Sequence, residues 1–277
     1  MLAESAYGKS SVRLVKVTRH GDRHDLTDFR VAIRFEGDYT ASYVDGDNSD
    51  VLPTDTMKNT VDAIAATSPV AEPESFALRL AEHFLARNPR LRRVRIDIGE
   101  HPWGRIPVGN REHGQAFVRQ AAETRTATVQ QDREAAVAGA GVADLLILKS
   151  SRSAFAGFLR DEYTTLPDAN DRLLATSLTA TWRYRDTAVE FGQAWRAVRT
   201  TLLETFAEHD SRSVQHTLHA MGQAVLAAVD DVSSVRLVMP NKHHLPVDLA
   251  RLGVENRNEV FVPTDEPYGL IEATLVR

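Results

Sequence analysis

The feature that most constrains the fold of this chain is a recurring alternation of apolar and polar residues with a period of two. In residues 29–35, Phe, Val, Ile and Phe alternate with Arg, Ala and Arg, and residues 94–98 repeat the pattern. Successive side chains of a strand point to opposite faces of a sheet, so each segment predicts a strand with one buried face. The same alternation returns at 178–184, 235–239 and 271–275. We therefore expect a fold built around antiparallel sheets.

Helical periodicity separates these strands. Apolar residues recur every four positions over 76–84, which predicts a helix with one buried face. Apolar stripes over 191–206 and 214–225 predict two further helices, and Ser213 or Ser211 could cap the second of them. The order of elements is therefore strand–strand–helix–helix–strand–strand, written twice.

This order suggests a duplicated α+β chain, with one ββααββ unit over residues 1–137 and a second over 138–277. The join falls in residues 135–141, which are rich in Ala and Gly, and the halves share no obvious identity residue by residue. A sheet with this many strands and one face to cover often closes into a barrel between subunits.

The composition of the chain excludes several kinds of site and partner. The chain has 277 residues, of which 43% are apolar and 26% charged, an ordinary globular balance. Cysteine is absent, which excludes disulfides, thiolate zinc sites, Fe–S clusters and a Cys nucleophile. The net charge of −5 argues against nucleic acid or an anionic membrane as the main partner. No apolar run approaches the roughly 20 residues that span a bilayer.

The histidines predict no metal site. His20 and His24 have a helical i,i+4 spacing, but they flank a Gly-Asp-Arg sequence that is typical of a loop between strands. His101 and His113 have no carboxylate partner at a recognised spacing. Any redox chemistry must then come from another cofactor or from the substrate itself.

Five short segments, spread along almost the whole chain, add a more specific signal. They are Tyr7-Gly8-Lys9, Thr54-Asp55-Thr56-Met57-Lys58-Asn59-Thr60, Gly157-Phe158-Leu159-Arg160-Asp161-Glu162-Tyr163-Thr164-Thr165-Leu166, Ser213-Val214-Gln215 and Pro240-Asn241-Lys242-His243. In order and spacing they resemble the uricase (urate oxidase) family, from about Tyr7 to the C-terminus. None of the five would mean much alone, and it is their common register that makes the resemblance specific.

The resemblance implies a tandem tunnelling fold, or T-fold. Antiparallel sheets from two chains would form an intersubunit β-barrel, and two barrels would stack as a homotetramer. It also implies active sites at subunit interfaces, where Lys9 and Thr54 of one chain meet residues from the second half of another.

The resemblance further implies a set of residues that bind urate. They are Thr54, Asp55, Phe155, Arg172, Val214 through its main chain, Gln215 and Asn241. Urate is a planar anion edged with carbonyl and N–H groups, so a guanidinium fork can donate two parallel hydrogen bonds to it. An amide offers one donor group and one acceptor, and a Phe face stacks on the ring. Ala156 departs from the family, in which a bulkier residue often follows the stacking Phe.

Lys9, Thr54 and His243 match the proposed proton relay of the family, and Asn241 matches the residue that holds oxygen or water over the ring. Removing a second proton from urate gives an electron-rich dianion that can reduce O₂ directly. The resemblance therefore implies oxidation of urate by O₂ and water to 5-hydroxyisourate and hydrogen peroxide, with no metal or organic cofactor. The enzyme would contribute positioning, proton movement and electrostatics.

Each of these residues also has an ordinary interpretation. Phe155 would be a core residue, and Arg172 would form a surface ion pair with the adjacent Asp171. Gln215 would be a solvated helix residue, and Lys9 would be a mobile side chain near the N-terminus. The resemblance to the family favours the functional interpretation in each case.

Two other functions remain open at this point. Other T-fold proteins bind pterins or GTP, some of them with zinc, and anchor the heterocycle with a Glu where this chain has Gln215. A uricase-like chain that binds purines but has lost catalysis is the second alternative, although the relay residues are intact. The C-terminus, Leu275-Val276-Arg277, lacks a tripeptide of the Ser-Lys-Leu type, so we expect a bacterial cytoplasmic enzyme.

Overall fold

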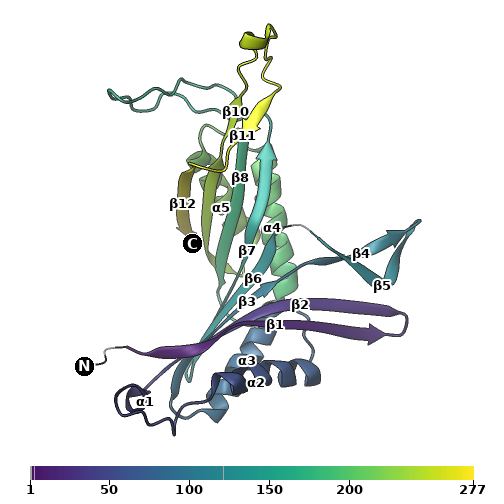
Figure 1. Cartoon of the computed structure of the whole chain (residues 1–277), viewed down its shortest axis with the longest axis vertical. Helices are drawn as coiled ribbons and strands as arrows, with labels where there is room; N and C mark the ends of the chain where they lie inside the picture. The colour runs from purple at the N-terminus through teal and green to yellow at the C-terminus, as the bar shows by residue number, and fades with distance from the viewer. Residues whose placement is uncertain (1, 3, 121) are drawn as a thin grey trace. The chain divides into compact units, whose positions relative to one another are not determined.

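The computed structural model describes residue 2, residues 4–120 and residues 122–277. Long antiparallel strands and helices follow one another along the chain (Figure 1). By its internal contacts the chain divides into two compact units, Met1–Gly141 with Arg183–Trp195, and Val142–Trp182 with Arg196–Arg277. Among the described helices, none combines length and apolar composition in the way that crossing a bilayer requires.

The sheet of the first unit is antiparallel. Its strands run in the order β1 (Ala6–His20), β2 (Arg23–Gly37), β3 (Leu91–Glu100) and β6 (Thr124–Asp132). The connection from β2 to β3 contains α1 (Thr40–Val44), α2 (Thr54–Thr67) and α3 (Pro73–Arg87). A hairpin of β4 (Trp103–Val108) and β5 (Arg111–Arg119) is inserted between β3 and β6 and pairs separately from the sheet.

The apolar face of β2 forms the core of the first unit. Phe29, Val31, Ile33 and Phe35 are only 0–3% exposed, as their alternation predicts. The ring of Phe35 contacts that of Phe84 in α3 edge-on, with centroids 5.1 Å apart. The helices therefore cover this face of the sheet, and each such side chain contributes about 1.5–3 kcal/mol by leaving water.

Strand β1 contains one more residue than the part of β2 that it faces. Three steps along β1, from Lys9 to Val12, match two steps along β2, from Ile33 to Val31. Ser11 lies in this bulge with a φ of 58°. Because side chains alternate along a strand, the extra residue changes which positions face the core, from odd-numbered before the bulge to even-numbered after it. Lys9, paired with Ile33, therefore shares the core face with Val12.

In the second unit the strands run in the order β7 (Ala136–Lys149), β8 (Leu174–Tyr184), β9 (Val232–Lys242) and β12 (Gly269–Val276). Helices α4 (Phe191–Glu208) and α5 (Val214–Ala228) connect β8 to β9. The connection from β9 to β12 contains a small hairpin of β10 (His244–Pro246) and β11 (Phe261–Pro263), with the short 3-10 helix η1 (Ala250–Leu252) between them. Strands β7 and β8 and helix α4 contribute residues to both units.

Helix α5 packs closely on β12. Its apolar stripe is buried, with Leu218, Met221 and Val225 at 0–2% exposure. A Cβ atom at Gly222 would lie only 2.7 Å from Cδ1 of Leu275, so the missing side chain lets the helix approach the strand. This packing fixes the position of the first turn of α5 relative to the sheet of its unit.

The ββααββ order predicted for each half is confirmed, with α1 and the two hairpins as additions. Ser213 caps α5 as expected, because its Oγ accepts a hydrogen bond from the N–H of His216 at 3.1 Å. Most of the Ala- and Gly-rich join, residues 136–141, belongs to strand β7. The turn lies just before it, where Oδ1 of Asp132 accepts hydrogen bonds from the N–H groups of Glu134 and Ala135. The domain boundary at residue 138 stays a prediction.

A buried carboxylate in the first unit makes the stability of the fold depend on pH. Glu74, in the first turn of α3, is 0% exposed and accepts a hydrogen bond from Arg125 at 2.7 Å. Burial raises the pKa of Glu74 to about 7, although the positive charge of Arg125 opposes the shift. Burial also raises the pKa of Glu100, whose carboxylate lies 3.7 Å from the same guanidinium.

We expect this carboxylate to lower the stability of the protein as pH rises. Between about pH 4.5 and 7 the folded state holds a proton on Glu74 that the unfolded state releases, so the free energy of unfolding falls across this window. Urea titrations at about pH 5 and pH 8 measure this fall in the unchanged protein and in Glu74→Gln.

Glu112→Gln is the matched control. Glu112 pairs with Arg23 at the surface, where its side chain is 63% exposed. Its replacement should leave the pH dependence of unfolding as it is in the unchanged protein. An equal pH dependence in Glu74→Gln and the unchanged protein would contradict the assignment to Glu74.

Candidate active site

The first group of predicted residues begins with the Tyr7-Gly8-Lys9 motif in β1. The hydroxyl oxygen of Tyr7 accepts a hydrogen bond from the N–H of Leu52 at 3.0 Å, which ties β1 to the segment leading into α2. A Cβ atom at Gly8 would lie 1.8 Å from the carbonyl oxygen of Ile33, so only glycine allows β1 and β2 to approach this closely. Lys9 is half-buried, on the same face of β1 as Tyr7.

Thr54 and Asp55 occupy the first turn of α2. Pro53 is the N-cap residue, and Met57, which is 0% exposed, anchors the turn in the core. Thr54 is half-buried, whereas Asp55 is exposed and its carboxylate accepts a hydrogen bond from Asn59 at 3.0 Å. The N–H groups of a first turn have no partner within their own helix, so they remain available to a ligand.

Phe155 begins the second group of predicted residues. Its backbone forms two hydrogen bonds with Ala169, at 2.7 and 2.9 Å, which fix the position of its ring. The ring of Phe158 stacks on it with centroids 4.9 Å apart and an interplanar angle of 10°. Phe158 therefore covers one face of Phe155, and a planar ligand can stack only on the other. The contact also supplies packing beside Ala156, where the family often has a bulkier residue.

Arg172 lies beside Phe155, with its guanidinium carbon 5.2 Å from the centre of the ring. The side chain is half-buried, and burial lowers the pKa of Arg172. Its Nε is fully buried and has no hydrogen-bond partner among the described residues. A buried donor without a partner costs about 1–3 kcal/mol, which an acceptor on a ligand would recover.

The expected ion pair between Arg172 and Asp171 is not formed. The carboxylate of Asp171 instead accepts hydrogen bonds from the hydroxyl of Ser151 at 2.6 Å and from the N–H of Ser153 at 3.1 Å. The guanidinium of Arg172 thus stays free of carboxylates within the described part of the chain. This contradicts the ordinary interpretation of Arg172 as half of a surface ion pair.

Val214 and Gln215 occupy the first turn of α5. Val214 is buried at 3% exposure, and Gln215 is exposed. The cap on Ser213 uses only the N–H of His216, so the N–H groups of the two preceding residues have no helical partner. Free N–H groups at the start of a helix favour an anionic ligand.

Main-chain hydrogen bonds join the segments that carry Phe155, Arg172 and α5. Ser211 forms a parallel bridge with Ser153, in which its carbonyl accepts from the N–H of Ala154 at 2.8 Å and its N–H donates to Arg152 at 3.0 Å. The N–H of Arg172 donates to the carbonyl of Ser153 at 2.8 Å. The structure thus brings the predicted stacking ring, the guanidinium and the helix start onto one scaffold.

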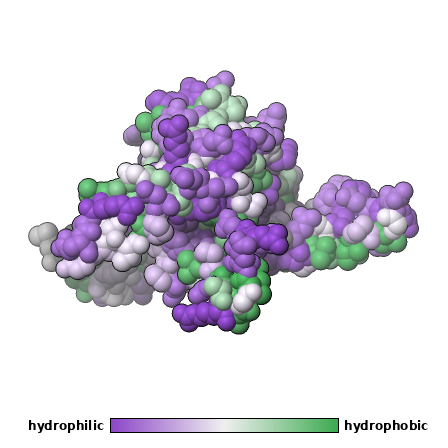
Figure 2. Space-filling view, turned by 90° about the horizontal axis from the view of Figure 1, so that it is seen from above, coloured by the Kyte–Doolittle hydropathy of each residue, from purple (hydrophilic) through white to green (hydrophobic). Residues whose placement is uncertain are grey.

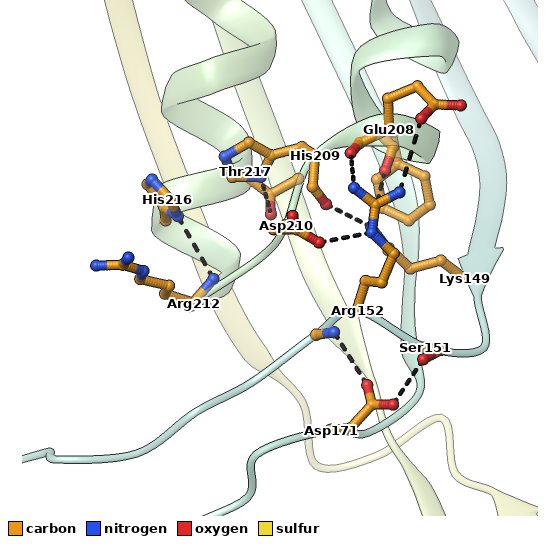
Figure 3. A network of polar contacts seen from close by, with 12 residues as sticks. Lys149, Ser151, Arg152, Asp171, Glu208, His209, Asp210, Arg212, His216 and Thr217 are labelled. Carbon is orange, nitrogen blue, oxygen red and sulfur yellow. Dashed lines mark hydrogen bonds and ion pairs between the residues drawn. The ribbon is translucent and has the colours of Figure 1, made fainter.

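Side chains reinforce this scaffold (Figure 3). Nε of Arg152 donates a hydrogen bond to Oδ1 of Asp210 at 2.5 Å. Nζ of Lys149, at the end of β7, donates to the carbonyl of His209 at 2.6 Å. Burial lowers the pKa of Lys149, as expected for a buried ammonium group. The end of β7 is therefore fastened to the connection between α4 and α5.

Asn241 and His243 lie at the end of β9 and just beyond it. Asn241 pairs with Gly269 of β12, and the carbonyl of His243 accepts a hydrogen bond from the N–H of Thr264 at 2.8 Å. Both side chains are half-buried. Lys242, between them, is held by an ion pair with Asp265 at 2.9 Å. Within the described residues, no hydrogen bond joins Asn241 or His243 to the scaffold around Arg172.

Two further observations define the surroundings. A cavity of about 930 Å³ in the first unit is lined mainly by charged residues, and none of the predicted site residues lines it. The described residues contain no group of three or more His, Cys, Asp or Glu side chains arranged to hold a metal ion.

Sequence reasoning missed Asp171, Ser211 and Phe158 as parts of the site. Asp171 and Ser211 bind residues 18–59 positions away in the sequence, and no local pattern marks such a pairing. Phe158 does lie in one of the five segments, so its position in that motif was the available signal.

Comparison with known proteins gives one consistent result. The uricase family model matches residues 5–130 and 138–272. The uricase of Arthrobacter globiformis is 42% identical over 277 residues, which cover 100% of this chain and 90% of that protein. The uricase of Danio rerio is 37% identical over 279 residues, which cover 99% of this chain and 94% of that protein. A crystal structure of the Arthrobacter globiformis uricase has a TM-score of 0.96 and 42% identity, covering 100% of this chain and 95% of that chain. A crystal structure of a uricase from Bacillus fastidious has a TM-score of 0.84 at 25% identity, covering 98% and 93%.

Proposed function

The chain belongs to the uricase family, and we propose that it works without a bound metal or organic cofactor, in sites that two subunits share. It is a urate oxidase, which oxidises urate with O₂ and water to 5-hydroxyisourate and hydrogen peroxide. The observation that carries the proposal for its site is the half-buried side chain of Arg172, whose guanidinium carbon lies over the ring of Phe155, 5.2 Å from its centre, and whose Nε has no partner among the described residues.

Urate binds on the scaffold of the second unit. Its ring stacks on the face of Phe155 that Phe158 leaves free, and the fork of Arg172 donates two hydrogen bonds to one edge. The amide of Gln215 pairs with the opposite edge, and the main chain of Val214 donates a hydrogen bond from the first turn of α5. An anion placed here satisfies donors that the protein leaves without partners.

In the proposal, proton movement uses Lys9 and Thr54 of one chain and His243 of another. Lys9 and Thr54 lie in the first unit, and His243 follows β9 in the second. In the proposed site, Lys9 accepts the second proton of urate through Thr54, with His243 as the further member of the relay. Asp55 contributes its first-turn N–H, and Asn241 holds O₂ or water above the ring. The electrons come from the urate dianion, so the protein supplies orientation and proton transfer.

The exposed strands support an assembly of several chains. β1 and β12 are edge strands, and β1 is long, so each exposes backbone N–H and C=O groups that favour pairing with another chain. Large apolar side chains are exposed on these strands, including Val15 at 56%, Leu270 at 59% and Val276 at 68%. Apolar areas also lie between hydrophilic ones on the face in Figure 2. We propose a homotetramer in which such strands close barrels between subunits.

Metal dependence is tested by activity after treatment with EDTA. Dialysed protein supplied only with urate and air should remove the absorbance of urate and release one peroxide for each urate oxidised. A requirement for added zinc or flavin would overturn the cofactor-free mechanism. Binding of a pterin or GTP without urate oxidation would instead favour the other class of T-fold protein.

Shared sites are tested by mixing two inactive variants. If Lys9 and Arg172 of one site come from different chains, co-expression of Lys9→Met and Arg172→Ala chains restores intact sites. With random assembly, about a quarter of the sites would combine an unchanged Lys9 from one chain with an unchanged Arg172 from the other. Activity should then rise toward about a quarter of that of the unchanged protein. Activity no greater than that of the separate variants would place both residues in one chain.

A further inference from the structure

A carboxylate that neither binds urate nor takes part in the relay lies directly beside the site. Asp171 precedes Arg172 in the chain, and its two oxygen atoms accept hydrogen bonds from Ser151 and Ser153. These donors lower the pKa of Asp171, first through the hydroxyl of Ser151 and then through the N–H of Ser153. The group is therefore charged at neutral pH and acts as a double acceptor.

The segment that Asp171 holds is the one that leads to Phe155. Arg152, between the two serines, has a φ of 61°, a conformation that costs a non-glycine residue about 1 kcal/mol or more unless its neighbours hold it. Ser153 is 1% exposed, and its carbonyl accepts the hydrogen bond from the N–H of Arg172. Ser153 thus donates a hydrogen bond to the carboxylate of Asp171 and accepts one from the N–H of Arg172, so the two segments are joined at adjacent residues.

Residues 152–154 are also held by hydrogen bonds to the connection between α4 and α5. The side chain of Arg152 binds Asp210 and the carbonyl of Glu208 (Figure 3). Ser211 pairs with Ser153 through the main chain. The connection before α5 therefore holds residues 152–154 from one side. Among the side chains of residues 169–172, that of Asp171 holds the same segment from the other side.

We propose that Asp171 is a positioning residue, which sets the spacing between the guanidinium of Arg172 and the ring of Phe155 and thereby the affinity for urate. The inference rests on the proposed binding mode. Two hydrogen bonds accepted by one carboxylate fix residue 171 against residues 151–153. Arg172 is the next residue after Asp171, and Phe155 lies two residues after Ser153, so both start from these fixed points. A shift of about 1 Å between ring and guanidinium would misalign a bidentate contact.

The experiment compares Asp171→Ala with Asp171→Asn. Alanine removes both hydrogen bonds, so we expect the Kd of urate, titrated calorimetrically without oxygen, and the KM to rise about 10- to 100-fold. The kcat should stay within about 3-fold, because no group that moves protons is changed. Asparagine can accept from the N–H of Ser153 and donate to the hydroxyl of Ser151, so it should return the Kd to within about 3-fold of the original value.

Asp132→Ala is the control for general loss of stability. Asp132 also accepts hydrogen bonds from two backbone N–H groups, those of Glu134 and Ala135, but it lies at the end of β6 in the first unit. It should leave the Kd unchanged. An equal loss of affinity in both alanine variants, or no loss in Asp171→Ala, would overturn the positioning role.

Ser151→Ala covers the case in which Asp171→Ala does not fold. It removes one of the two hydrogen bonds and should raise the Kd about 2- to 5-fold. An unchanged Kd in this variant would contradict the inference. If the unchanged protein itself neither binds nor oxidises urate, the proposed function fails, which is a different outcome from loss of the positioning role alone.

Discussion

Lys9→Met is expected to slow the oxidation of urate by about 10²–10⁴-fold, the contribution of a general base, while the affinity for urate changes little. Lys9 is half-buried on the core face of β1, and Met has nearly the same length without the amine. The residues proposed to bind urate, including Arg172, Gln215 and Asp55, are unchanged in this variant, so the Kd of urate measured without oxygen should stay within about 3-fold. Stopped-flow measurement of urate consumption gives the turnover.

Lys16→Met is the matched control for this prediction. Lys16 lies on the same face of the same strand, where its amine donates hydrogen bonds to the carbonyls of Ala65 and Ser68 at 2.6 and 2.7 Å. Its loss should lower the stability of α2 but leave the kcat within a few-fold. A turnover in Lys9→Met equal to that of the unchanged protein would exclude Lys9 as the base.

Arg172→Ala is expected to raise the KM for urate about 100-fold or more. Two charge-assisted hydrogen bonds are lost, each worth roughly 1.5–3 kcal/mol. The free protein should lose little stability, because its buried Nε has no partner to lose. Steady-state kinetics and thermal unfolding of the free protein measure these two effects.

Arg172→Lys and Arg236→Ala separate the contributions to this effect. Lysine keeps the charge but not the planar fork, so it should recover only part of the lost affinity. Arg236 is an exposed arginine of β9, paired with Glu272 at 2.8 Å, and its replacement should not change the KM. A KM for Arg172→Ala within 3-fold of the original would mean that urate binds elsewhere.

Local pattern predicted most of the elements of this fold. The alternation in residues 29–35 predicts β2 because every second side chain enters a core that the helices cover. It does not predict β1, whose alternation changes phase at the bulge and whose outward residues are exposed. The join between the two units at 135–141 stays a prediction, and most of its Ala and Gly residues lie in strand β7, because small residues also fit a buried strand.

The site was harder to predict than the fold, because its hydrogen bonds connect distant positions. Adjacency in the sequence suggested an ion pair between Asp171 and Arg172, whereas the carboxylate binds Ser151 and Ser153, about 20 positions earlier. Family resemblance predicted a functional role for Arg172, but only the three-dimensional structure shows that its Nε lacks a partner among the described residues. The meeting of Lys9 and Arg172 across two chains stays a prediction.

The extra residue in β1 divides that strand into two stretches that can vary independently. Substitutions from Val12 onward are limited by the hydrophobic interior beneath them, Tyr7 is limited by its ring contacts with Phe35 and Tyr39, and Lys9 is limited by the proposed site. The orientation of both stretches depends on the number of residues in the bulge between them. Removing one serine at the bulge would turn Tyr7 and Lys9 to the opposite face of the sheet, so that the ring of Tyr7 would lose its contacts with Phe35 and Tyr39 while the register from Val12 onward stayed the same. Natural variation in this region should therefore exchange residue types freely but preserve length.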